Sequence, residues 1–154
     1  SLINREAPWG ILSLEMAGTS DVAAKIIQSW SEEARADALF NLGADFLFLV
    51  LYSSALFALC VAAADTCGAF MRRVGYAVGY LQFVAALCDV LENCFLWQIL
   101  RSSMLDAQPI EWATFFATAK FYLLLAAAGY VLWAFGRIAA GMSFVFVSAL
   151  LKKS

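Results

Sequence analysis

Three long apolar stretches dominate the hydrophobic pattern of this chain, and each predicts a membrane-spanning helix. They cover about residues 44–64, 74–100 and 112–135, and about 20 apolar residues are enough to cross the hydrocarbon core of a bilayer. The second stretch is long enough to tilt, and the third has aromatic residues at both ends, as is typical of helix ends at the membrane interface. The pattern therefore predicts an all-α fold, an integral membrane helical bundle with three transmembrane helices.

The part of the chain before the first span is more polar and predicts a folded segment. Residues 12–16 alternate between apolar and polar side chains, which indicates a short extended run. Thr19 or Ser20 then suits the N-cap of an amphipathic helix over about 19–34. Its apolar face consists of Val22, Ile26, Ile27 and Trp30. Such a helix either lies on the membrane surface or covers the mouth of the bundle as a lid.

Basic residues predict the orientation of the spans. Arg72 and Arg73 occupy the connection between the first two spans, whereas acidic residues outnumber basic ones before the first span. The end of the chain is basic as well, with Arg137, Lys152 and Lys153. By the positive-inside rule, residues 1–43 lie outside and the C-terminus is cytoplasmic.

Translocation of the external segment needs a signal. Because the chain begins with Ser1 and shows no signal peptide, we expect an upstream signal or transmembrane helix, which would make a bundle of four spans. An N-terminal tail that is translocated without such a helix is the alternative.

The last apolar stretch, residues 138–151, is too short to span comfortably. We expect residues 136–154 to form an apolar tail after the 44–135 bundle, lying along the cytoplasmic surface or contacting a protein partner.

Composition supports a membrane protein and excludes several functions. Hydrophobic residues make up 64% of the 154-residue chain and charged residues 14%, against about 45–50% and 25% in soluble domains. The net charge of −2 gives no basic face for nucleic acid. Histidine, the commonest metal ligand, is absent. The sequence predicts membrane lipid as a partner, no nucleic-acid partner, no cofactor and no metal.

Ionisable residues inside the spans are the candidate site. Asp45, Asp89, Glu92 and Lys120 occupy apolar helices, where a charge costs about 3 kcal/mol and therefore usually faces the protein interior. Asp45 begins its span, so it could instead lie among the lipid headgroups. Helical spacing adds neighbouring polar residues on the same faces, namely Gln82 and Asn93 on the second span and Tyr52 on the first.

The charges of this cluster leave its role open. One lysine faces three carboxyl groups, so either a carboxyl is protonated or a cation is bound. Buried polar networks can also simply hold a bundle together. The leading interpretation is a non-catalytic accessory protein, or one that binds a lipid or small hydrophobic ligand. The alternatives are a membrane-embedded acid–base enzyme acting on a lipid-like substrate and, less favoured, a proton-coupled carrier.

Several blocks of sequence resemble a family of small bacterial integral membrane proteins whose activity is not known. The blocks are GILSLEMAGT (10–19), IIQSW (26–30), GADFLFLVLY (43–52), LCDVLEN (87–93) and AKF (119–121). The resemblance implies a four-span bundle of the bacterial inner membrane whose first span precedes this chain. It implies no activity, substrate or cofactor.

Overall fold

The computed structural model describes residues 1–102 and 107–151, with side chains described as far as residue 141. Within these residues every regular element is a helix. The elements are α1 (Ile11–Glu15), α2 (Ser20–Ser29), α3 (Glu32–Asp65), α4 (Ala69–Arg101) and α5 (Ala107–Leu151). Three of them, α3, α4 and α5, contain stretches long and apolar enough to cross a membrane. The predicted all-α bundle with three candidate spans is confirmed.

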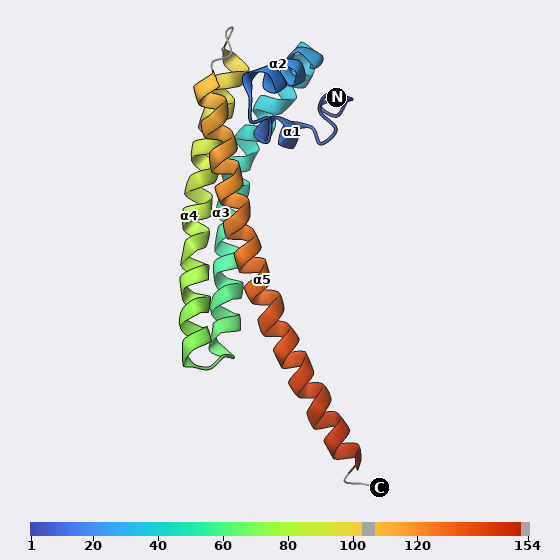
Figure 1. The fold of residues 1–154 in the computed structure, drawn as a ribbon, viewed down its shortest axis with the longest axis vertical. Coiled ribbons are helices and arrows are strands. Elements are labelled where there is room, and N and C mark those ends of the chain that lie inside the picture. Colours follow the sequence, from blue (N-terminus) through green and yellow to red (C-terminus); the bar gives the residue numbers. More distant parts are fainter. Residues whose placement is uncertain (103–106, 152–154) are drawn as a thin grey trace.

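Helices α3 and α4 form an antiparallel hairpin, and α5 packs mainly against α4 (Figure 1). Glycine makes the close approach possible. A Cβ atom on Gly75 would lie 2.7 Å from the Cβ of Ala64 and would overlap the ring of Tyr130, so only glycine fits there. Tyr130 in turn donates its hydroxyl to the carbonyl of Met71 at 2.9 Å, which fixes α5 against α4.

Helix α5 is a single helix that extends well beyond the hairpin of α3 and α4 (Figure 1). At 1.5 Å per residue its length is about 67 Å, twice the thickness of a bilayer core. The predicted third span and the predicted 138–151 tail are therefore consecutive parts of one helix, because no proline interrupts it after Pro109. The side chains of residues 142–151 lie outside those that the structure describes.

Helices α1 and α2 pack over one end of the bundle, which we call the capped end (Figure 1). The predicted extended run over 12–16 is wrong, because Ile11–Glu15 is helical. Of the alternating apolar residues, Leu14 is buried whereas Met16 is 46% exposed, so the alternation does not mark a two-sided strand. Two glycines with positive φ, Gly10 (60°) and Gly18 (68°), flank this short helix and let the chain reverse at both ends.

Helix α2 begins as predicted, with the Thr19 hydroxyl accepting a hydrogen bond from the backbone N–H of Val22. It ends at Ser29, five residues before the predicted end, because Ser31 caps the start of α3. Ile26 and Ile27 are buried in an apolar core at the capped end, together with residues of α3, α4 and α5. Helix α2 therefore packs over the capped end of the bundle, and its position on the membrane surface stays a prediction.

Candidate functional site

A buried lysine lies at the centre of the candidate site. Lys120 Nζ on α5 is 2.8 Å from Asp89 Oδ1 and 2.7 Å from Glu92 Oε2, both on α4. Asp89 and Glu92 are one helical turn apart, so their carboxyl groups flank the same ammonium. All three residues are buried, Glu92 completely. The ion pairs therefore join α4 to α5 inside the bundle.

The helices bring these residues to one level. Asp45 and Lys120 each lie about 20 Å along α3 and α5 from the capped end. Asp89 and Glu92 lie about 18 Å and 14 Å from the corresponding end of α4. Asp45, which the sequence places at the edge of its span, is half-buried and lies more than three turns inside α3, because that helix begins at Glu32.

Two further hydrogen bonds join α3 to the cluster. The Tyr52 hydroxyl donates to Asp89 Oδ2 at 2.9 Å, and Asn93 Nδ2 donates to Asp45 Oδ2 at 2.7 Å. Asp89 is thus held between an ammonium and a phenol, whereas Asp45 accepts its hydrogen bond from a neutral amide. Polar residues from α3, α4 and α5 form one network across the three candidate spans.

Glu15 on α1 completes the cluster, and the sequence alone did not identify it. Its Oε2 lies 3.9 Å from Lys120 Nζ, the same ammonium that contacts Glu92 Oε2. The other Glu92 oxygen, Oε1, is buried and meets no hydrogen-bond partner among the described residues. Burial raises the pKa of the Glu15 carboxyl, while the Lys120 ammonium opposes this shift.

Gln82 lies apart from these groups. It is completely buried on α4, and its Nε2 donates to the carbonyls of Val78 and Leu123, at 3.1 Å and 3.2 Å. Gln82 therefore ties α4 to the backbone of α5 two turns away from Asp89. The other predicted residues (Asp45, Tyr52, Asp89, Glu92, Asn93 and Lys120) are brought together in the network.

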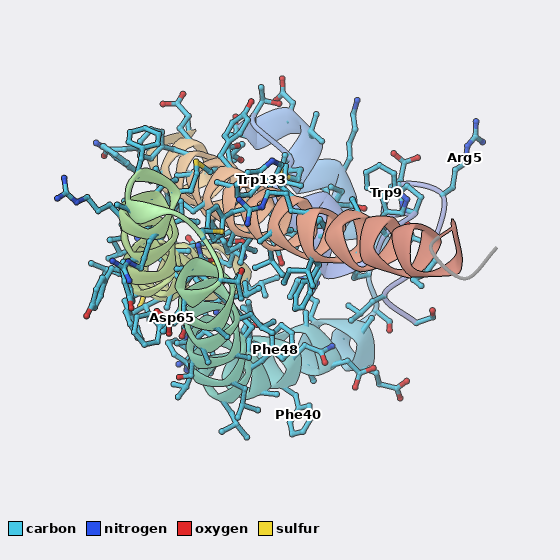
Figure 2. All side chains as sticks on the ribbon, turned by 90° about the horizontal axis from the view of Figure 1, so that it is seen from below. Arg5, Trp9, Phe40, Phe48, Asp65 and Trp133 are labelled. Carbon is cyan, nitrogen blue, oxygen red and sulfur yellow. The ribbon has the colours of Figure 1, made fainter. Side chains whose placement is uncertain are left out.

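A pocket of about 320 Å³ adjoins the cluster between α3 and α5. Its polar end is formed by five groups of the cluster, Glu15, Asp45, Tyr52, Asp89 and Lys120. Its apolar wall is formed by Phe48, Leu56, Phe121 and Leu124. Because Phe48 is 59% exposed, the pocket opens at the side of the bundle. Figure 2 shows Phe48 on the side of α3 toward α5, whereas Phe40 points away from the bundle.

A second pocket, of about 490 Å³, adjoins the first one at Glu15. It is lined by the N-terminal segment around Trp9 and by α3, and it shares Glu15, Asp45 and Phe48 with the first pocket. Helix α1 thus carries Glu15 into the lining of both pockets. Within the part of the chain that the structure describes, no group of three histidine, cysteine or acidic side chains has the geometry to hold a metal ion.

Comparisons with known proteins give no relative for this chain: no family model, no curated protein and no solved structure matches it.

Proposed function

We propose that this protein is a non-catalytic membrane protein that binds a lipid or another small hydrophobic ligand between α3 and α5. The observation that carries the proposal is the two-part lining of the pocket, apolar along Phe48 and Leu124 and charged at Asp45 and Asp89. An amphiphilic molecule matches both parts, and the lateral opening lets it enter from the bilayer. A cluster that served only to join helices would not need an adjoining pocket.

Two adjacent leucines of α5 allow a direct test. Leu124 lines the pocket, whereas Leu125 is 67% exposed on the outside of the bundle. A dodecanol probe carrying a photoreactive diazirine, added to the protein in lipid nanodiscs, should crosslink to pocket residues such as Phe121. Leu124→Trp should fill the pocket and abolish this crosslink, and Leu125→Trp should leave it intact. Equal crosslinking of all three proteins, or none in the pocket of the parent protein, would contradict the proposal.

An acid–base enzyme acting on a lipid-like substrate is the second candidate, and one observation favours it. Glu15 lines both pockets, so a carboxyl group able to exchange a proton lies beside a site that an amphiphile can reach. Glu15→Gln would abolish turnover of such a substrate but leave its binding measurable.

A proton-coupled carrier is less favoured. On the side of the cluster away from the capped end, an apolar core that includes Cys60, Ala127 and Tyr130 closes the bundle.

We also propose that the protein lies in a bacterial inner membrane. Residues 1–43 would then be on the outer side of this membrane and the α3–α4 connection in the cytoplasm. The support is the distribution of basic residues, since Arg72 and Arg73 follow that connection. Cys67 in the connection is a native reporter. In a variant whose other cysteines are replaced, a membrane-impermeant maleimide should label Cys67 only in inside-out vesicles. In a second variant, which lacks Cys67 and carries Asp21→Cys, the same reagent should label residue 21 only in right-side-out vesicles. The reverse labelling pattern would show that the protein has the opposite orientation in the membrane.

The C-terminal part of α5 is proposed to contact a protein partner. Residues 138–151 are apolar and extend past the hairpin, so they need lipid or a protein surface around them. Chemical crosslinking of the full chain in its native membrane, compared with a chain truncated after residue 141, should give a product that the truncation removes. An unchanged set of products would exclude this partner.

A further inference from the structure

Asp45 is the least compensated charge of the cluster. Its carboxylate accepts a hydrogen bond from the neutral amide of Asn93, and no lysine or arginine of the described chain lies within 4 Å of it. The Lys120 ammonium is already engaged by Asp89 and Glu92 at 2.8 Å and 2.7 Å. A carboxylate in a low-dielectric site is costly unless it meets a positive charge. Asp45 lines both pockets, so a bound ligand can supply that charge.

Aromatic rings lie next to this carboxylate. Phe48 and Tyr52 follow Asp45 by three and seven residues on α3, so all three lie on one face of the helix. The centroids of the two rings are 5.6 Å apart, and both rings line the same pocket as Asp45. Carboxylates together with aromatic faces are the groups that recognise organic ammonium ions, including quaternary ones.

The balance of charge selects the same headgroup. The cluster has four carboxyl groups, those of Glu15, Asp45, Asp89 and Glu92, and one ammonium, that of Lys120. An anionic headgroup would be repelled by these carboxylates. A bare metal ion lacks a suitable set of acidic ligands among the described residues. A singly charged ammonium needs only the contacts that Asp45 and the rings provide.

We propose that the pocket takes a cationic amphiphile, with an amine or quaternary ammonium headgroup against Asp45 and Phe48 and an apolar tail along Leu56 and Leu124. The proposal rests on the proposed ligand-binding function and specifies the chemical class of the ligand. The tail would lie toward the middle of the bilayer, since Leu56 and Leu124 are farther from the capped end than Asp45 and Lys120 are.

Competition against the photoreactive dodecanol probe tests the headgroup. Three competitors share one dodecyl tail: dodecyltrimethylammonium, dodecanol and dodecanoate, each added at low mole fraction to nanodiscs of zwitterionic lipid. Dodecyltrimethylammonium should compete about tenfold better than dodecanol, and dodecanoate should be the weakest. Asp45→Asn keeps a side-chain oxygen that can accept from Asn93, and it should abolish the tenfold advantage. Asp37→Asn, an exposed change on the same helix, should retain it.

The outcomes separate the two proposals. If all three competitors displace the probe equally, or dodecanoate competes best, the pocket binds amphiphiles but the ammonium proposal is overturned. If the probe does not crosslink in the pocket at all, the ligand-binding function itself fails. If Asp45→Asn still prefers dodecyltrimethylammonium over dodecanol, another group recognises the ammonium, and the proposed role of Asp45 as its binding partner is overturned.

Discussion

The ammonium nitrogen of Lys120 lies 2.8 Å from Asp89 Oδ1, and this buried contact joins the longest helix of the protein to the middle of α4. Both residues lie where a lone charge is expensive. Removing either residue therefore leaves the other as a buried charge without its partner, and the resulting loss in the free energy of unfolding can be measured.

Replacing Lys120 with methionine should destabilise the protein by about 3–5 kcal/mol, because it leaves Asp89 buried without a cation. The free energy of unfolding in bicelles, measured by steric trapping, reports the change. Lys25→Met on the exposed side of α2 is the matched control and should have little effect. Lys120→Met combined with Asp89→Leu should recover part of the loss, since an apolar pair removes the unpaired charge. A double variant less stable than Lys120→Met alone would contradict this account.

Close packing at Gly75 gives a second prediction. An added Cβ would overlap Tyr130 and crowd Ala64, so Gly75→Ala must push α4 away from both neighbouring helices. We expect a loss of about 1–3 kcal/mol in the free energy of unfolding. Gly129→Ala on α5 is the control, because nothing lies within 4 Å of a Cβ atom at that position. A Gly75→Ala protein as stable as the Gly129→Ala protein would show that the helices are less tightly packed at Gly75.

The sequence predicted the bundle well because membrane spans follow from long runs of apolar residues, a signal that does not depend on tertiary contacts. It also predicted which faces of α3, α4 and α5 carry Asp45, Asp89 and Lys120, because helical periodicity decides this.

Glu15 could not be identified in the same way. Its position in the cluster depends on α1, a five-residue helix with no periodic signal, and on the turns at Gly10 and Gly18 that fold it over the bundle. The apolar stretch that begins beside Asp45 covers only part of α3, which starts earlier with a polar first turn at Glu32 and Glu33, so hydropathy alone did not locate the start of this helix. Pockets arise where side chains from different helices fail to meet, so only the structure reveals them.

The attachment of α1 to α5 gives a third prediction. The Thr114 hydroxyl donates to the carbonyl of Glu15 at 3.0 Å and accepts from the N–H of Gly18 at 3.1 Å. Thr114→Val removes both bonds and should weaken the docking of α1 by about 1–3 kcal/mol. Hydrogen exchange of residues 11–17 should become faster, whereas α3 should be unaffected. Thr118→Val is the control, because the Thr118 hydroxyl donates within α5, to the carbonyl of Thr114. Equal exchange in the two variants would contradict this attachment.

Glu15 makes the docking of α1 depend on pH. Burial raises the pKa of its carboxyl above the ordinary value of 4.5, so the docked helix binds a proton more tightly than the undocked helix. Docking is therefore strongest below about pH 4.5 and weakens as the pH rises through the raised pKa of Glu15. The groups that face Glu15 are Lys120 on α5, Asp89 and Glu92 on α4 and Asp45 on α3.

Hydrogen exchange of α1, corrected for the intrinsic pH dependence of amide exchange, measures this effect. In the parent protein the protection of residues 11–15 should fall from mildly acidic to mildly alkaline pH. Glu15→Gln keeps a hydrogen-bond donor toward Glu92 and cannot ionise, so its protection should stay nearly constant over the same range. Glu6→Gln, an exposed change in the same segment, should behave like the parent. If the protection of the parent rises with pH, the ion pair with Lys120 outweighs burial and Glu15 holds α1 in place as a carboxylate.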